Sequence, residues 1–261
     1  MASLLENGVK YIEKNLNNDH LAWHGMAVKW RWILKHSKQI LILRRRTKNA
    51  SIFKKLLSVC SGDISSCKGH KLPSGFHNYT LIDDLMTLLN NRNGFYGFES
   101  ALHVFPFETV GEEIGVVAWN DNSLWIDCYD DLARNAIFFA EDVFGGQFCI
   151  KQDGIYTFDP ETGSFDYLAP DINEWCKKIL EDYQVLTGYP LANAWQKKHG
   201  PIPVGYRLVP KVPFVAGGEY EPDNLYLEKS TVAMKARANI ALQIRDVPDG
   251  SNIQLRLIDG D

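Results

Sequence analysis

Long apolar runs are missing from this sequence of 261 residues. The longest strongly apolar run, residues 39–43, is about a strand in length and is followed directly by Arg44, Arg45 and Arg46. A membrane-spanning helix needs roughly 20 predominantly apolar residues, so no transmembrane segment is predicted. The first residues also lack the basic start and the long apolar stretch of a signal peptide. We therefore expect the chain to remain where it is made, in the cytoplasm.

Paired cysteines are also missing. The five cysteines are scattered and none forms a C-x-x-C pair, which predicts reduced thiols in a reducing compartment. Cys60, Cys67, His70 and His77 lie close together, but the gaps between them are six, two and six residues. Zinc ligands in short loops are usually separated by roughly two to four residues within each pair. We therefore expect no metal site and interpret this stretch as a connector with free thiols.

The recurrent catalytic motifs are absent as well. The sequence contains no G-x-S-x-G, no H-E-x-x-H and no phosphate loop of the G-x-x-x-x-G-K type. Adjacent carboxylates such as Asp130-Asp131 and Glu141-Asp142 would have to face one substrate to act as an acid and a base. Neighbouring residues of a strand point to opposite faces, so we expect one inward and one solvated group in each pair. The sequence thus predicts neither an enzyme nor a cofactor.

Acidic residues are absent between His20 and Gly62, where ten lysines and arginines lie. Since the whole chain has a net charge of −4, the remainder is strongly acidic. Three tryptophans between positions 23 and 32 are interleaved with these cations, and this mixture is typical of nucleic-acid binding. A solvated helix with its aromatics on the core side has the same composition, and so does a segment that contacts the acidic remainder. Nucleic-acid binding by this basic block, residues 20–62, is kept as the alternative function.

The first sixty residues have mostly helical patterns. Residues 22–32 and 49–59 are predicted helices, because their large apolar side chains recur on one face. The stretch 61–78 contains three glycines and a proline, which predicts a boundary. We therefore divide the chain into a helical basic amino-terminal segment, residues 1–70, and an α+β domain with a carboxy-terminal extension, residues 71–261.

Antiparallel sheet is predicted between residues 97 and 170. Short segments rich in Val, Ile, Phe and Trp alternate there with turn-forming pairs such as Asp153-Gly154. A helix at residues 81–90, N-capped by Thr80, precedes this region. The predicted strands are residues 114–120, 123–129, 136–140, 147–151, 155–158 and 165–168, of which the first two form a hairpin.

Helices are predicted after the sheet. Asp171 and Glu174 form a capping-box pattern, and Ser230 is a second candidate N-cap. The predicted elements are helices at residues 171–188, 192–198 and 230–244 and a last strand at 252–258. The predicted fold class is α+β, with a mostly antiparallel sheet of about six strands and helices packed on it.

Acidic residues are densest between positions 130 and 182, where 12 Asp and Glu residues accompany four basic ones. Complementary electrostatic fields speed the association of a cationic protein with such a surface, although an acidic face also serves simply to keep a protein soluble. Acidic character and predicted positions at hairpin tips identify the candidate partner-binding residues as Asp130, Asp131, Glu141, Asp142, Asp153, Asp159, Glu161 and Asp166.

A family resemblance is carried by residues 138–175. This block contains FFAEDVFGGQF at 138–148 and DGIYTFDPETG at 153–163, then Leu-Ala-Pro and a predicted helix with Trp175. The pattern of two hairpins followed by a tryptophan-bearing helix resembles the SUKH superfamily, which includes many bacterial immunity proteins. The similarity covers about residues 75–185, and the tail resembles the extension of one bacterial subgroup.

The resemblance implies an α+β fold, no catalytic residues and a cytoplasmic antidote against a toxin delivered by a neighbouring cell. Toxin partners in the family are diverse and are often nucleases or nucleotide-modifying enzymes. We therefore expect an immunity protein that binds a cognate bacterial protein toxin and neutralises it by steric occlusion.

Overall fold

The computed structural model describes residues 52–68, 71–248, 250–251 and 253–254. The chain divides into two compact units, residues 1–50 and 51–261, and only the second contains described residues. Most of the basic block, the helix expected at 22–32 and most of the strand expected at 252–258 lie outside the described residues. No described helix has both the length and the apolar character that crossing a membrane requires.

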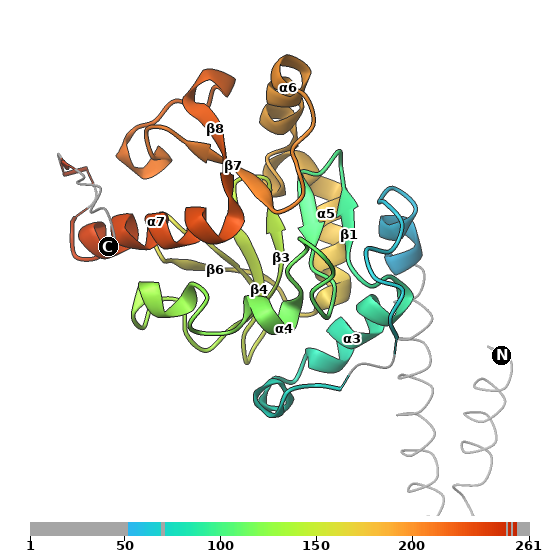
Figure 1. Ribbon diagram of the computed structural model, residues 1–261. Helices are drawn as coiled ribbons and strands as arrows, with labels where there is room; N and C mark the ends of the chain where they lie inside the picture. Colours follow the sequence, from blue (N-terminus) through green and yellow to red (C-terminus); the bar gives the residue numbers. More distant parts are fainter. Residues whose placement is uncertain (1–51, 69–70, 249, 252, 255–261) are drawn as a thin grey trace, which may run out of the picture. The chain divides into compact units, whose positions relative to one another are not determined.

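The centre of the second unit is a six-stranded antiparallel meander in which each strand pairs with the next one along the chain (Figure 1). The α+β class with about six strands is confirmed, and the four strands expected between residues 136 and 168 are all present. Its strands are β1 (Phe95–Gly97), β2 (Leu102–Val104), β3 (Ile137–Asp142), β4 (Gln147–Ile150), β5 (Ile155–Phe158) and β6 (Phe165–Ala169).

The prediction of a hairpin at residues 114–129 is wrong. This stretch forms two short helices, α4 (Val116–Trp119) and η2 (Ile126–Tyr129). Trp119 and Trp125 are buried against the sheet, with their indole N–H groups bonded to Gln147 Oε1 at 2.8 Å and to the Trp119 carbonyl at 3.0 Å. Short apolar runs fit a strand or a buried helix equally well by period, and here tertiary packing decided the outcome.

The first two of the six strands are instead β1 and β2, which were not predicted. Each has three residues, too few for a period-two pattern to be recognised. Phe98, Glu99 and Ser100 all have positive φ in the turn that joins them, although none of them is glycine. The turn therefore lacked the glycine signal by which sequence reasoning finds hairpins.

Helices cover both faces of the sheet. On one face, α5 (Ile172–Leu186) places Trp175 in edge contact with Phe139 and Phe148. On the other face lie α4, η2 and α7 (Ser230–Ile244), the last with Met234 in the same core (Figure 1). The expected cap of α5 is confirmed, since Asp171 Oδ1 accepts from the N–H groups of Asn173 and Glu174 at 3.0 Å. The sheet is thus the middle layer of three.

Residues 52–68 belong to this body. Residues 52–57 are helical, and Phe53, Leu56 and Leu57 are buried in the main core. Cys60 then forms an isolated antiparallel β-bridge with Gly97, on the side of β1 that faces away from β2. The compact unit therefore begins at residue 51, ahead of the boundary expected at 70.

The helix expected at 81–90 is present as α3 (Ile82–Asn91), but its N-cap is Leu81. The Thr80 hydroxyl instead donates to the Gln152 carbonyl at 3.4 Å. Ser230 is likewise the first residue of α7 rather than its cap, and its hydroxyl donates to the Gly205 carbonyl at 3.1 Å. At both positions the hydroxyl donates to a carbonyl that is distant in sequence and does not cap the helix.

A second, smaller sheet follows α6 (Tyr189–His199) and was not expected from the proline-rich sequence. It is a hairpin of β7 (Tyr206–Pro210) and β8 (Leu225–Lys229). A satellite core that includes Val143, Phe144 and Trp195 joins this hairpin and α6 to the end of β3. Three short 3-10 helices complete the described elements, η1 (Ser74–Asn78), η3 (Phe214–Ala216) and η4 (Pro222–Asn224).

Candidate functional site

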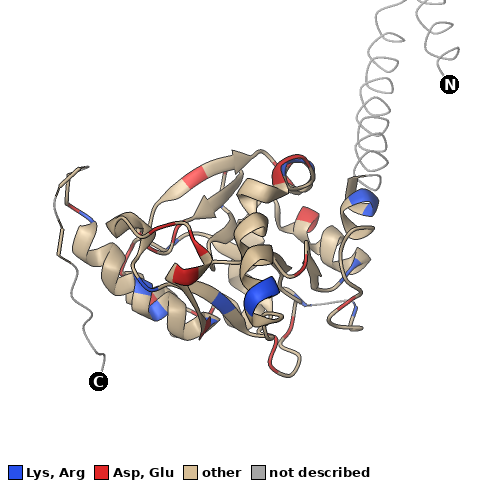
Figure 2. Cartoon of the chain, turned by 90° about the horizontal axis from the view of Figure 1, so that it is seen from above, with Lys and Arg blue, Asp and Glu red and all other residues tan. Residues whose placement is uncertain are grey.

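The eight acidic candidates fall into two groups by burial. Five are exposed, as a partner-binding role requires, whereas Glu141 and Glu161 are buried and Asp142 is half-buried. Acidic positions are spread over several separate segments of the body (Figure 2). The exposed candidates are Asp130, Asp131, Asp153, Asp159 and Asp166.

Three of the exposed carboxylates lie in two neighbouring segments, the end of η2 and the turn between β5 and β6. We call these three residues, Asp130, Asp131 and Asp159, the acidic turn surface. The Tyr129 hydroxyl donates to the Pro160 carbonyl at 2.9 Å, which joins the end of η2 to the turn between β5 and β6. Asp131 is paired with Arg245 at 2.8 Å, and this hydrogen bond lowers the pKa of its carboxyl. The acidic turn surface thus lies where the β5–β6 turn meets η2.

Asp153 and Asp166 lie apart from that surface. Asp153 is in the β4–β5 turn, at the opposite end of β5, and its Oδ2 accepts from the Tyr156 hydroxyl at 3.0 Å. Asp166 is in the middle of β6 and pairs in register with Thr157. The structure therefore does not bring the eight candidates together as one site.

Glu141 is an internal ion-pair partner, so its expected role in partner contact is wrong. It is 1% exposed, and its Oε1 lies 2.5 Å from Arg207 Nη2. Burial acts to raise the pKa of Glu141, but the Arg207 guanidinium and the His103 ring outweigh it and leave the pKa below its usual value.

His103 connects that ion pair to a second glutamate. Its Nδ1 lies 2.5 Å from Arg207 Nη2 and 3.1 Å from Glu141 Oε1. Because a guanidinium only donates, the closer contact makes Nδ1 an acceptor and leaves the proton on Nε2, 3.4 Å from Glu113 Oε2. Tyr96 stacks on the ring and donates its hydroxyl to Glu113 at 2.8 Å. Burial lowers the pKa of His103, so the ring is neutral near pH 7.

This network forms one wall of a cavity of about 260 Å³. His103, Glu113 and Glu141 line it together with Lys229 and Ser230 at the beginning of α7. Arg207 extends from β7 and pairs with β3, so the network also ties the small sheet to the large one. The observed contacts give it a structural role in holding these two sheets together.

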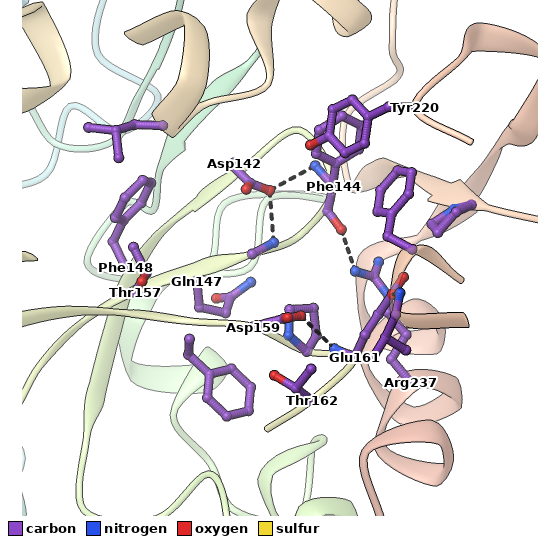
Figure 3. Close-up of a pocket in the computed structure, with 17 residues that line it drawn as sticks. Asp142, Phe144, Gln147, Phe148, Thr157, Asp159, Glu161, Thr162, Tyr220 and Arg237 are labelled. Carbon is purple, nitrogen blue, oxygen red and sulfur yellow. Dashed lines mark hydrogen bonds between the residues drawn. The ribbon is translucent and has the colours of Figure 1, made fainter. Parts of the chain in front are cut away.

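A larger cavity, of about 340 Å³, opens beside the acidic turn surface (Figure 3). Asp142, Asp159 and Glu161 line it, and so do the aromatic rings of Phe144 and Tyr220 among others. We call it the carboxylate cavity. Its remaining lining residues are Gly146, Gln147, Phe148, Thr157, Phe158, Pro160, Thr162, Leu186, Pro210, Phe214, Val215 and Arg237.

In the described part of the chain, several hydrogen-bond donors around the carboxylate cavity are already used by its carboxylates and carbonyls, but two nitrogens of Arg237 are not. Asp142 Oδ1 accepts from the N–H groups of Phe144 and Gly146, both at 2.8 Å. Glu161 Oε2 accepts from the Val215 N–H at 2.9 Å. Arg237 donates through Nη1 to the Phe144 carbonyl, and its buried Nε and Nη2 have no partner within the described residues. The cavity wall therefore offers carboxylate oxygens, which can accept from a ligand that donates hydrogen bonds, beside the unpartnered Nε and Nη2 donors of Arg237.

Burial raises the pKa of two of these carboxyls, Asp142 and Glu161. Burial raises the pKa of Asp142 to about 7, against the opposing effects of its two backbone hydrogen bonds and of Arg237. Burial also raises the pKa of Glu161, more than the Val215 hydrogen bond and Arg237 lower it. For both carboxyls, burial thus raises the pKa more than the attraction of Arg237 lowers it. A further cation in the cavity would favour the ionised form of both.

Sequence reasoning missed the partners of these carboxylates. Arg207 and Arg237 lie in segments expected to be a crossing and an ordinary helix, yet both are almost fully buried. A single arginine at those positions has no distinguishing local pattern, because its burial depends on a carboxylate or a carbonyl more than 60 residues away. His103 was missed for the same reason.

The described residues contain no group of three or more His, Cys, Asp or Glu side chains placed to hold a metal ion. All five cysteines are free thiols. Cys149 and Cys176 are buried, and burial raises the pKa of both.

Comparison with known proteins adds a structural similarity. No family model and no curated protein matches the chain. Among solved structures the chain is similar to one described as the crystal structure of Atu4351 from Agrobacterium tumefaciens, with 11% sequence identity, a TM-score of 0.49, and coverage of 71% of this chain and 88% of that one. The function is therefore inferred from the geometry of this chain.

Proposed function

We propose that this protein is an immunity protein of the SUKH type, which binds a basic bacterial toxin and neutralises it by steric occlusion. The block that carries the sequence resemblance, residues 138–175, forms one continuous part of the body, from β3 through β6 into α5. A protein of this class acts by recognition, which we assign to the acidic turn surface and the carboxylate cavity beside it.

The observation that carries the proposal is the carboxylate cavity beside the acidic turn surface. Exposed carboxylates steer a cationic partner and raise its association rate. A concave site lined by aromatic rings and accepting oxygens suits a lysine or arginine side chain, since anchors in such pockets dominate many protein interfaces. Asp159 belongs to both features, so a single basic protein surface can engage the two at once.

The direct experiment is co-expression with the product of the neighbouring gene in a sensitive bacterial strain. We expect growth to be restored by this chain and a 1:1 complex to be isolated. Continued killing at high expression of the chain, with no complex detected, would overturn the proposal.

A charge variant then tests the surface. Replacing Asp130, Asp131 and Asp159 by Asn should slow association about tenfold at low salt, with little change at high salt, because steering is screened. A matched control removes three exposed carboxylates elsewhere, by D83N, E181Q and D223N. Equal slowing by both triple variants would mean that net charge matters and the acidic turn surface does not.

A further inference from the structure

Strand β6 forms an open edge of the large sheet. It is last in the strand order and pairs only with β5 among the described residues. The opposite edge, at β1, is partly covered, since the Ser61 N–H donates to the Tyr96 carbonyl at 2.7 Å and the Ile64 N–H to the Gly94 carbonyl at 2.9 Å. Among the described residues the outer side of β1 is thus partly hydrogen-bonded, whereas the outer side of β6 has no pairing strand.

The register shows which main-chain groups of β6 face outward. The Asp159 N–H donates to the Ser164 carbonyl at 3.0 Å, which makes this a hydrogen-bonded pair. Hydrogen-bonded and non-hydrogen-bonded pairs alternate along an antiparallel ladder. The pair Thr157 and Asp166 is therefore bonded within the sheet, whereas Phe165 and Tyr167 direct their N–H and C=O groups away from β5.

Within the described residues no segment covers this edge, and the register shift of β6 lies beyond Tyr167, after its two outward-facing residues. Proline and lysine are among the residues that blunt natural edges, and β6, with the sequence Phe-Asp-Tyr-Leu-Ala, contains neither. Asp166 is exposed, and Tyr167 is 56% exposed. Its two outward-facing residues provide two donors and two acceptors in a row.

The charge around β6 selects the kind of partner. Asp166 lies on the strand itself, with exposed Asp153 in the preceding turn and Asp159 in the turn that leads into β6. Lys151 is the nearby cation, and its ammonium lies over the Phe165 ring at 3.6 Å, where the ring already engages it. The turn that leads into β6 holds Asp159 of the acidic turn surface, so one end of the edge adjoins the surface proposed for toxin binding.

We propose that the outer edge of β6 accepts an extended basic segment of the protein partner as a seventh strand. Main-chain hydrogen bonds to Phe165 and Tyr167 provide the pairing, and carboxylates beside the strand select lysine and arginine. This inference rests on the proposed function and specifies how the partner is held.

The test uses the full chain in complex with the product of the neighbouring gene. Amide hydrogen exchange should slow at least tenfold at Phe165 and Tyr167, with little change at Asp166, which is already bonded. Tyr167→Pro removes the outward N–H and should weaken binding at least tenfold. Tyr167→Thr is the control, because it removes the ring but keeps the N–H group. Circular dichroism and the melting temperature confirm that both variants fold.

The outcomes separate this inference from the proposed function. A complex that forms with unprotected Phe165 and Tyr167 amides overturns strand addition and leaves toxin binding intact. If no complex forms, the proposed function fails, and a synthetic nine-residue peptide of alternating Lys and Val becomes the probe. Protection by this peptide and none by its Glu and Val counterpart supports the inference, and no protection at millimolar peptide overturns it. Protection that grows with protein concentration alone indicates self-pairing and also overturns it.

Discussion

Replacing Arg207 with Met isolates the energetic role of the buried ion pair. Arg207 is 1% exposed, and its guanidinium lies 2.5 Å from Glu141. Methionine keeps an unbranched apolar side chain but removes the charge, so the Glu141 carboxylate stays buried without its counter-ion. Breaking one side of a buried pair in this way costs about 3 to 5 kcal/mol. We therefore expect Arg207→Met to be strongly destabilising although it lies in a small peripheral sheet.

Denaturant and thermal unfolding of the full chain, followed by tryptophan fluorescence, measure this loss. Domains of roughly 150 to 250 residues lose about 2 to 4 °C in Tm for each 1 kcal/mol, so the melting temperature should fall by about 6 to 20 °C. The double variant Glu141→Gln/Arg207→Met removes both charges, and we expect it to recover a large part of the loss because no unpaired charge remains.

The pH dependence gives a second check with a defined sign. In the native protein burial alone would raise the pKa of Glu141, but Arg207 lowers it, so the pair stabilises above the ordinary glutamate pKa and loses this effect as pH falls. In Arg207→Met burial dominates and the pKa rises, so the ionised carboxylate costs more as pH rises. The loss should be larger at pH 8 than at pH 5. A loss below about 1 kcal/mol, or one that is equal at both pH values, refutes the reasoning.

Three further predictions follow from named contacts. Burial lowers the pKa of His103 beside Glu113, Glu141 and Arg207, so its unfolded form takes up a proton below about pH 6.5 and stability should fall by up to about 2 kcal/mol from pH 7 to pH 5. His103→Gln should remove this contribution in urea titrations at the two pH values, and an unchanged slope counts against it. Gly188 has φ of 67°, and a Cβ there would lie 2.3 Å from Phe144 Cε2, so Gly188→Ala should cost about 2 to 4 kcal/mol. Gly217→Ala, at φ of 84° with nothing within 4 Å, should cost only about 1 kcal/mol in the same unfolding assay, and equal losses would contradict the steric argument. Asp142, with its pKa raised to about 7 by burial, should make affinity for a basic partner rise about tenfold from pH 6 to pH 8 in calorimetry. Asp142→Asn should flatten that rise, and a rise that persists in this variant would assign it to another group.

Strands and helices with strong local signals were predictable from the sequence. The segments at residues 136–168 have apolar residues between turn-forming pairs such as Asp153-Gly154, and they became β3 to β6. Asp171 has the side chain that an N-cap needs, and α5 begins directly after it. These features depend on neighbours within a few positions, which is why composition and spacing were sufficient.

Position on the surface was predictable only in part. Asp130, Asp131 and Asp159 are exposed as expected, because turns place polar residues in water. Glu141 has the same residue type and lies at the end of a predicted strand, yet it is buried, because Arg207 comes from β7 to pair with it. No local pattern distinguishes a solvated carboxylate from one whose counter-ion is 66 positions away.

Local sequence thus determined the α+β class, the meander from β3 to β6 and the cap of α5, since each depends on short-range backbone preferences. Tertiary structure alone decided that residues 114–129 are helical, that β1 and β2 complete the sheet, and that the proline-rich tail forms β7 and β8. It also decided which carboxylates reach solvent and which line the carboxylate cavity. The physical reason is that burial and charge pairing are properties of residues brought together by the fold, and their free energies exceed the weak local preferences of short apolar segments.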